Sequence, residues 1–227
     1  MDRDGTLIID EGYLADPKRV TLIPGVIESL RRLQEAGFFL FIITNQSGVA
    51  RGFFSLADME RVQARLMVLL KDEGIELRDW RFCPHHPDGI VEEFRMHCHC
   101  RKPEHGMIMD LAEEYQIDLA DSWVIGDKDS DVRAGANAGC RTILLCGDKH
   151  YGANNVSNTC RPEMPNEESK LEEVDGTRPR PRPRQEKLAR VDFRCQTITE
   201  AVKVILSNEE FIVQKFLPVK IGRGSDS

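Results

Sequence analysis

The first residues of the chain place two carboxylates beside a turn. Asp2 and Asp4 are separated by one residue and are followed by Gly5-Thr6. Nucleophilic catalysis needs such a pair, because one carboxylate attacks the substrate while the second group moves a proton. The same spacing is common in surface turns and helix caps. The remaining polar motifs of the chain therefore decide between catalysis and an ordinary turn.

Three further polar motifs contain residue types that suit phosphoryl chemistry. They are Thr44-Asn45-Gln46, Arg101-Lys102-Pro103 and the acidic run at 126–131. Hydroxyl and ammonium donors stabilise phosphoryl oxygens, and carboxylates bind divalent cations. Together with the opening pair, the four motifs in this order resemble the haloacid dehalogenase superfamily of phosphotransferases. The resemblance extends over residues 1–147.

The resemblance implies a role for each of these side chains. Asp2 is the expected nucleophile, which would form an aspartyl-phosphate, and Asp4 is the expected general acid and base. Thr44 and Lys102 would stabilise the phosphoryl oxygens. Asp127 would hold Mg²⁺ together with Asp2 and the backbone carbonyl of Asp4.

Cysteine and histidine residues gather between positions 83 and 100. Cys83-x-His85 and Cys98-x-Cys100 offer three thiolates and one imidazole, a closed ligand set for structural zinc. Buried thiols without a metal are the alternative. The family pattern and the repeated one-residue gap favour His85 over the other candidate ligands, which are His86, His97 and His99. A metal here would make rigid the segment that carries Lys102.

Within the superfamily, the chain resembles the heptose bisphosphate phosphatases. The resemblance rests on the Cys/His loop, on Gly12-Tyr13, and on the stretches 50–53 and 91–95. It implies Mg²⁺-dependent removal of the 7-phosphate from D-glycero-D-manno-heptose 1,7-bisphosphate, in the synthesis of nucleotide-activated heptose for lipopolysaccharide and other cell-surface glycans. Histidinol phosphatases, which tend to have a shorter metal loop, are the alternative enzyme. A zinc-stabilised binding protein without activity is the third hypothesis.

The same resemblance implies further site residues in the loops. Asp131 is expected either to take part directly or to cap the helix that follows. For Tyr13, ordinary packing is the alternative to substrate contact. The residues expected to contact the sugar or its second phosphate are Asp10, Glu11, Gly12, Tyr13, Asn45, Gln46, Ser47, Arg101 and Lys128.

Alternating strand and helix patterns must position these residues. The apolar run 38–43 predicts a strand that is buried on both faces. Helices are expected after Pro24-Gly25 and after Ser55, where Asp58 completes a capping box. This alternation predicts an α/β fold with a doubly wound, Rossmann-like parallel sheet, whose ligands bind beyond the carboxyl ends of the strands.

One part of the predicted sheet is missing from the sequence. The superfamily places an apolar strand before the nucleophile, whereas only Met1 precedes Asp2 here. A central strand is costly to lose, because its neighbours lose pairing and buried apolar area. We therefore expect that the natural chain starts further upstream, and that the sheet built from this sequence lacks its first strand.

Composition sets the remaining expectations. The chain of 227 residues suits one domain: a core at 1–147 with the zinc loop 83–100, a polar and disordered insertion at 148–187, a final strand and helix at 188–207, and a tail at 208–227. A net charge of −7 argues against nucleic-acid binding. No apolar run is long enough for a membrane span. We expect a cytoplasmic monomer whose partner is a small phosphorylated sugar.

Overall fold

The computed structural model describes residues 1–147 and 191–209. The insertion predicted at 148–187 lies outside the described residues, as does all of the predicted tail beyond Glu209. Helices and strands alternate along the described chain as the sequence predicts. They are the short 3₁₀ helix η1 (Pro17–Arg19), α1 (Val26–Glu35), β1 (Leu40–Asn45), α2 (Leu56–Asp72), β2 (Leu77–Cys83), the 3₁₀ helix η2 (Glu92–Phe94), α3 (Gly106–Tyr115), β3 (Trp123–Gly126), α4 (Asp129–Ala138), β4 (Arg141–Leu145), β5 (Phe193–Cys195) and α5 (Ile198–Glu209).

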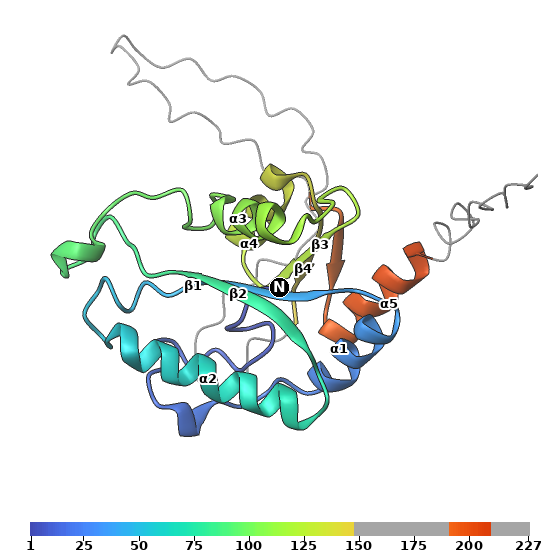
Figure 1. Cartoon of the computed structure of the whole chain (residues 1–227), viewed down its shortest axis with the longest axis horizontal. Coiled ribbons are helices and arrows are strands. Elements are labelled where there is room, and N and C mark those ends of the chain that lie inside the picture. The colour runs from blue at the N-terminus through green and yellow to red at the C-terminus, as the bar shows by residue number, and fades with distance from the viewer. Residues whose placement is uncertain (148–190, 210–227) are drawn as a thin grey trace, which may run out of the picture.

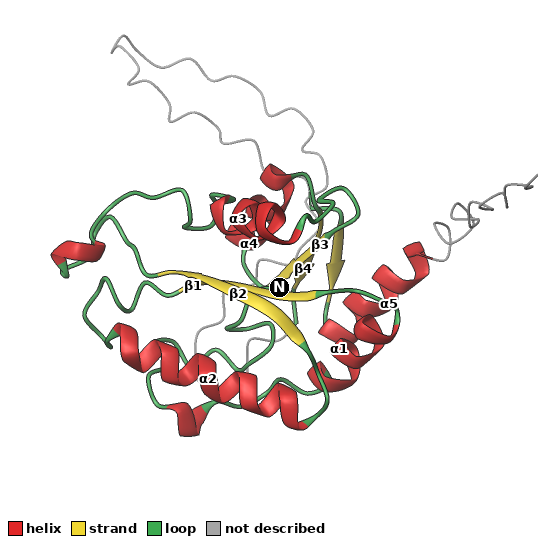
Figure 2. Cartoon of the chain, in the orientation of Figure 1, coloured by secondary structure: helices red, strands yellow, loops and turns green. Residues whose placement is uncertain are grey.

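The strands run parallel and are covered by helices on both sides (Figures 1 and 2). β1 pairs with β2, and β4 lies between β3 and β5 in a second ladder. α1, α2 and α5 lie on one side of the strands, and α3 and α4 lie on the other. The prediction of a doubly wound α/β fold is therefore confirmed. Such a fold collects the carboxyl ends of its strands at one edge, where ligands bind.

The two ladders are joined by the first two residues of the chain. The amino group of Met1 donates to the carbonyl of Phe41 at 2.9 Å, and the N–H of Ile43 donates to the carbonyl of Met1 at 2.9 Å. On the other side, the N–H of Asp2 donates to the carbonyl of Ile125 at 2.9 Å. Met1 and Asp2 thus lie between β1 and β3 and bridge the two ladders through backbone hydrogen bonds.

Helix ends follow the signals in the sequence. Ser55 and Asp58 form the predicted capping box, because the N–H of Ser55 donates to the Asp58 carboxylate at 2.9 Å and the N–H of Asp58 donates to the Ser55 hydroxyl at 3.2 Å. Gly25 begins α1 with a φ of +84°, and a Cβ there would lie 2.7 Å from the hydroxyl of Thr199 on α5. Glycine therefore allows the two helices to approach closely.

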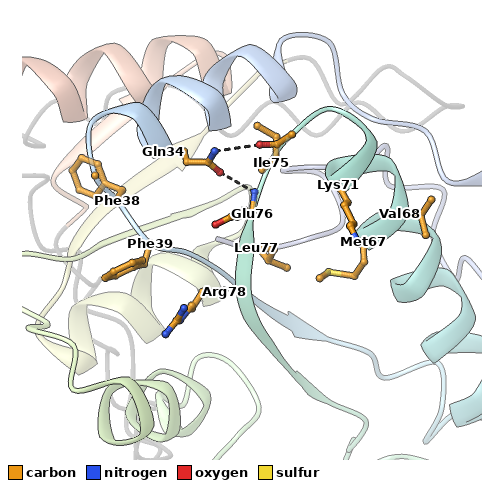
Figure 3. A pocket seen from close by; sticks show the side chains of 12 residues that line it. Gln34, Phe38, Phe39, Met67, Val68, Lys71, Ile75, Glu76, Leu77 and Arg78 are labelled. Carbon is orange, nitrogen blue, oxygen red and sulfur yellow. Dashed lines mark hydrogen bonds between the residues drawn. The ribbon is translucent and has the colours of Figure 1, made fainter.

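Gln34 joins α1 to the connection between α2 and β2. Its amide donates to the carbonyl of Gly74 at 3.2 Å, and its carbonyl oxygen accepts from the N–H of Glu76 at 2.8 Å (Figure 3). These bonds hold the amino-terminal edge of β2 beside α1. The hydrophobic core lies between the strands and the helices, and includes the fully buried Ile42 and Ile143.

The last strand starts later than the sequence predicts. The pattern at 189–193 indicates a strand, whereas β5 spans Phe193–Cys195. The carboxylate of Asp192 accepts from the backbone N–H of Thr142 at 2.8 Å and from its hydroxyl at 3.0 Å. A side chain thus satisfies the donor at the start of β4, and strand pairing begins one residue further on.

No helix of the described residues is long and apolar enough to cross a bilayer.

Candidate active site

The predicted catalytic residues meet at the carboxyl ends of the strands. Asp2 lies between β1 and β3, Thr44 lies near the end of β1, and Asp127 directly follows β3. Lys102 reaches the same place from the loop before α3, where its Nζ donates to the carbonyl of Ile43 at 2.9 Å. The fold therefore brings together side chains that are separated by up to 125 positions in the sequence.

Lys102 forms the electrostatic centre of the site. Its Nζ lies 2.7 Å from Oδ1 of Asp2 and 2.7 Å from Oδ1 of Asp131. The three side chains are nearly inaccessible, since Asp2, Lys102 and Asp131 are 4%, 3% and 1% exposed. Buried charges persist only when they are paired. Here one ammonium compensates two carboxylates, and the remaining negative charge suits a cation or a proton.

The environment keeps Asp2 ionised. Burial alone would raise the pKa of the Asp2 carboxyl, but the charges of Lys102 and then Lys128 outweigh burial and leave that pKa below its usual value. Burial and the nearby charge of Asp2 raise the pKa of Asp131 above its usual value. Asp2 is therefore a carboxylate at neutral pH, which is the form that a nucleophile requires.

Asp4 has a different environment. Its carboxylate accepts from Nε of Arg3 at 3.1 Å, from the amide of Gln46 at 2.8 Å and from the hydroxyl of Thr44 at 3.5 Å. Burial raises the pKa of Asp4, and this effect exceeds the opposing influence of Arg3. The pKa values of Asp2 and Asp4 are thus moved in opposite directions. This separation is typical of a pair in which one carboxyl attacks and the other carries a proton.

Three carboxylates form an acidic cluster that could hold a metal ion. One oxygen from each of Asp2, Asp127 and Asp131 lies within 4.8 Å of the other two. Gly5 makes room for this cluster, because a Cβ at Gly5 would lie 2.6 Å from Oδ2 of Asp127. Oxygen ligands at this spacing suit a hard cation such as Mg²⁺.

Asp131 has contacts that fit both of the alternatives that the sequence left open. One of its oxygens lies in the acidic cluster, its Oδ1 lies 2.7 Å from Nζ of Lys102, and its Oδ2 accepts from the N–H of Lys128 at 3.0 Å at the start of α4. Arg3 is a residue that the sequence analysis missed. It is 1% exposed, and its guanidinium makes two contacts with Asp4, from Nε at 3.1 Å and from Nη2 at 3.2 Å. Its position between Asp2 and Asp4 in the sequence could have suggested that it contacts one of these carboxylates.

Some of the predicted substrate residues hold the site together instead of lining an open surface. Asn45 binds the backbone of Lys102 twice: its amide donates to the carbonyl at 3.0 Å, and its carbonyl accepts from the N–H at 3.1 Å. Gln46 donates to both Thr44 and Asp4, in each case at 2.8 Å. These contacts fix the loop after β1 against the loop that carries Lys102.

The loop 10–13 lies beside the same edge. Asp10 accepts from Nζ of Lys128 at 3.0 Å and from the N–H of Gly12 at 2.9 Å, which forms a turn. Glu11 pairs with Arg19 at 2.8 Å. Tyr13 packs against Phe53 with ring centroids 4.4 Å apart, and both rings are more than half exposed. Ser47 accepts from the backbone of Arg51 through its carbonyl.

The four predicted zinc ligands converge in space. Cys100 Sγ lies 3.3 Å from Cys98 Sγ and 3.4 Å from His85 Nδ1, and Cys83 Sγ lies 3.5 Å and 3.6 Å from those two atoms, respectively. A tetrahedral zinc with bonds of about 2.0–2.3 Å separates its ligand atoms by roughly 3.5–3.8 Å. The cluster therefore has the size and donor types of a closed zinc site.

His86 and Arg101 neighbour the four predicted ligands in sequence and form other contacts. His86 contacts Arg51, with His86 Nε2 and Arg51 Nη2 2.9 Å apart, and accepts from the N–H of Asp88 at 3.1 Å through Nδ1. Among the described residues, His97 and His99 are outside the four-ligand cluster. Arg101 donates to the carbonyl of His85 at 3.1 Å, so the residue before Lys102 is bonded directly to the Cys/His loop.

Comparisons with known proteins agree with this geometry. A family model described as HAD-hydrolase-like matches residues 99–164. The chain is 42% identical over 149 residues to D-glycero-beta-D-manno-heptose-1,7-bisphosphate 7-phosphatase of Escherichia coli K12, a match that covers 65% of this chain and 78% of the relative. It is 43% identical over 139 residues to the protein of the same name from Rhodopseudomonas palustris, covering 61% and 77%.

A solved structure extends the similarity over nearly the whole length. The D,D-heptose 1,7-bisphosphate phosphatase from B. bronchiseptica, complexed with magnesium and phosphate, has a TM-score of 0.66 and 26% identity, and the match covers 91% of this chain and 96% of that one. The prediction from the four motifs and the Cys/His loop is thereby confirmed. The chain belongs to the HAD-like phosphatases, in the family of the D-glycero-D-manno-heptose-1,7-bisphosphate 7-phosphatases.

Proposed function

We propose that the protein removes the 7-phosphate of D-glycero-D-manno-heptose 1,7-bisphosphate, as a step toward nucleotide-activated heptose. The main support is the buried contact between Asp2 and Lys102 beside the acidic cluster. Relatives that are 42–43% identical carry the name of this activity and specify the β anomer, which we extend to this chain. This agreement favours the heptose substrate over histidinol phosphate and over a binding protein without activity.

The first step forms a bond between Asp2 and phosphorus. A carboxylate oxygen of Asp2 attacks the phosphoryl group, and the bond from phosphorus to the sugar oxygen breaks. Asp4 donates its proton to that leaving oxygen, which is why a raised pKa suits this residue. Lys102 and the Thr44 hydroxyl stabilise the oxygens of the transferring group, whose loose transition state depends on nearby cations and donors.

The second step restores the protein. Asp4, now a carboxylate, takes a proton from water, and the water oxygen attacks phosphorus. The bond from phosphorus to Asp2 then breaks, and inorganic phosphate leaves. The hydrogen bonds from Arg3 and Gln46 hold the Asp4 carboxylate in one orientation during this exchange. Both steps thus use the same two carboxylates in the roles that their environments favour.

The acidic cluster fits Mg²⁺. The side chains of Asp2, Asp127 and Asp131 would hold it, with the backbone carbonyl of Asp4 as a further oxygen ligand. Mg²⁺ in this place supplies positive charge to the phosphoryl oxygens. Asp131 thereby joins the ligands expected from the sequence, because its oxygen is as close to the cluster as those of the other two residues.

The Cys/His loop fits structural zinc. Burial and the neighbouring thiols raise the pKa of Cys83 and raise the pKa of Cys100 to about 11, so these ligands become thiolates only when a cation compensates their charge. The four ligands would fill a tetrahedral site and would leave no coordination position for substrate. Zinc would therefore act on catalysis by positioning Arg101 and Lys102, which follow the last ligand.

The test is phosphate release from three substrates under identical conditions: heptose 1,7-bisphosphate, histidinol phosphate and an aryl phosphate. We expect the heptose bisphosphate to give the highest kcat/KM and the released phosphate to come from position 7. Chelation of divalent cations should stop turnover, and added Mg²⁺ should restore it. A higher kcat/KM on histidinol phosphate would transfer the assignment to that substrate, and no release from any of the three would favour a binding protein.

A further inference from the structure

The loop after β1 is bonded to the Cys/His loop. β1 and β2 run side by side, and Asn45 and Cys83 are the last pair of their ladder, so the segments that follow leave the sheet at the same edge (Figure 1). Gln46 continues the pairing, because its N–H donates to the carbonyl of Cys83 at 2.7 Å. Cys83 is one of the four predicted zinc ligands and is fully buried. The backbone of a ligand therefore fixes the backbone of Gln46.

Ala50 makes the second connection between the two loops. Its N–H donates to the carbonyl of Pro84 at 3.3 Å, and its own carbonyl accepts from the N–H groups of Ile90 and Val91 at 2.8 and 2.9 Å. The approach is close, since a Cβ at Gly89 would lie 2.8 Å from the Ala50 carbonyl. The loop after β1 is thus held against the Cys/His loop at both of its ends. A loss of order in one loop is therefore expected to reach the other.

The side chain of Gln46 connects the Cys/His loop to the catalytic residues. It is 5% exposed, and its amide nitrogen donates to Oγ1 of Thr44 and to Oδ2 of Asp4, in each case at 2.8 Å. A primary amide has two N–H donors, and both are used here. Gln46 is therefore held in one orientation, with its backbone bonded to Cys83 and its side chain bonded to Asp4.

The contacts of Asp4 indicate what this bond does. Oδ2 of Asp4 accepts from Gln46, from the hydroxyl of Thr44 and from Nε of Arg3, whereas its Oδ1 accepts from Nη2 of Arg3 at 3.2 Å. Hydrogen bonds that end on a carboxylate oxygen favour its unprotonated form. The proton of the acid is therefore expected on Oδ1, which leaves that oxygen to donate to the substrate.

We propose that Gln46 is a positioning residue through which the Cys/His loop orients the general acid Asp4. This role rests on the proposed function, because Asp4 acts as the acid only in that mechanism. It adds a second route from the Cys/His loop to catalysis, beside the one that runs through Arg101 to Lys102. The two routes act on different atoms, since Lys102 stabilises the phosphoryl oxygens and Asp4 protonates the leaving oxygen.

The leaving group of the substrate separates the two routes. A sugar oxygen needs a proton to leave, whereas 4-nitrophenolate is a stable anion and leaves without one. The phosphoryl oxygens are the same in both kinds of substrate. A misplaced Asp4 should therefore slow the first step on heptose 1,7-bisphosphate and spare 4-nitrophenyl phosphate, while a misplaced Lys102 should slow both. The value of kcat/KM reports this step, because it includes no step after the leaving group has departed.

Gln46→Leu keeps the approximate size of the side chain and removes both donors. We expect kcat/KM to fall by about 30-fold or more on heptose bisphosphate and by about threefold or less on 4-nitrophenyl phosphate, since a positioned acid contributes about 10²–10⁴-fold. Asn45→Leu is the matched control, because the amide of Asn45 binds the backbone of Lys102 instead. It should lower kcat/KM on both substrates by similar factors.

Cys98→Ala tests the connection to the Cys/His cluster. Loss of one ligand should loosen the loop, and hydrogen exchange at the amide of Gln46, followed by NMR, should accelerate by about tenfold or more. The amide of Ala201, which donates to Thr197 outside both loops, should keep its rate. The ratio of kcat/KM on heptose bisphosphate to that on 4-nitrophenyl phosphate should also fall. Adding Gln46→Leu should lower this ratio little below its value in Gln46→Leu alone, because both changes act on one path.

Three results would overturn the proposal. Equal losses on the two substrates in Gln46→Leu would show that Gln46 does not act through Asp4. Unchanged exchange at Gln46 in Cys98→Ala would remove its connection to the Cys/His cluster. Independent, multiplied effects on the ratio in the double variant would show that the cluster reaches Asp4 by another route.

A failure of the proposed function would look different. The unchanged protein would then release no phosphate from heptose bisphosphate, whatever residue stands at position 46. The exchange rates need no substrate, so they would still decide whether the Cys/His cluster holds Gln46 in place.

Discussion

The acidic cluster and the Cys/His cluster bring their side chains together in opposite ways. Asp2, Asp127 and Asp131 come from distant parts of the sequence and lie at the ends of rigid strands and at the start of a helix. All four Cys/His ligands come from one loop of 18 residues. The first cluster depends on the fold and is fixed by Lys102. The second brings its own ligands together within a short stretch of sequence, and a metal there would compensate the charge of its thiolates. Catalysis should therefore be lost most completely by changes in the first cluster.

The largest effect should come from the nucleophile. Asp2→Asn replaces the carboxylate that attacks phosphorus in the proposed mechanism, and we expect phosphate release to fall by about 10⁴-fold or more. The Cys/His cluster shares no residue with this change, so zinc content and melting temperature should remain close to those of the unchanged protein. Activity near the original level, in protein shown by mass spectrometry to retain the substituted amide without deamidation, would exclude Asp2 as the nucleophile.

The next prediction concerns the ammonium that holds the acidic cluster. Lys102→Met leaves two buried carboxylates without their partner, and we expect the free energy of unfolding to fall by about 3–5 kcal/mol, together with a large loss of activity. Lys128→Met is the matched control, because Lys128 is half exposed and its pairing with Asp10 should contribute about 1 kcal/mol or less. Denaturant unfolding at neutral pH measures both. Equal losses would contradict the central position given to Lys102.

A smaller effect should follow from the Cys/His cluster. Cys98→Ala removes one ligand, and we expect loss of zinc and a fall in kcat of about tenfold through a misplaced Lys102. Cys146→Ala, a cysteine outside the cluster, should keep both zinc and activity. The measurements are metal content, at about one zinc per chain, and phosphate release in Mg²⁺. Full activity in zinc-free protein would separate the loop from catalysis.

The smallest expected effect is a shift of the pH profile. Arg3 opposes the raised pKa of Asp4, so Arg3→Met should raise that pKa further. The protonated form of Asp4 is the proposed acid of the first step, and it would then persist to higher pH. The alkaline limb of kcat/KM should therefore move to higher pH, while the acid limb, which reports ionisation of Asp2, should move less. A shift to lower pH would contradict the assignment of Asp4 as the acid.

The two clusters also differ in how far the sequence predicts them. The Cys/His cluster is local, so the spacing of its ligands, together with the family pattern that favoured His85, selected the residues that converge. The acidic cluster could be predicted only from the order of the motifs and from the rule that parallel strands bring their carboxyl ends to one edge of the sheet. Capping signals predicted the start of α2, and alternating patterns predicted the sheet.

The unpredicted features are contacts between distant side chains. The sequence could not show that Asn45 would bind the backbone of Lys102, because an amide in a loop suits a substrate equally well. It could not choose between the two expected roles of Asp131, whose carboxylate both contacts Lys102 and accepts from the N–H of Lys128. The start of β5 was misplaced because Asp192 replaces a strand partner with its side chain. Each of these depends on which loops become neighbours, and periodicity carries no information on that.

Asp131 has a consequence for how related chains are compared. One of its oxygens begins α4 and the other neutralises Lys102. A descendant that lost its substrate would still need this carboxylate to start the helix, and selection for folding alone would preserve it. The presence of Asp131 in a distant relative is thus weak evidence that the relative is an active enzyme. Asp2 also pairs with Lys102 and Asp4 pairs with Arg3, but neither starts a helix, so these are the positions where a silent relative would first diverge.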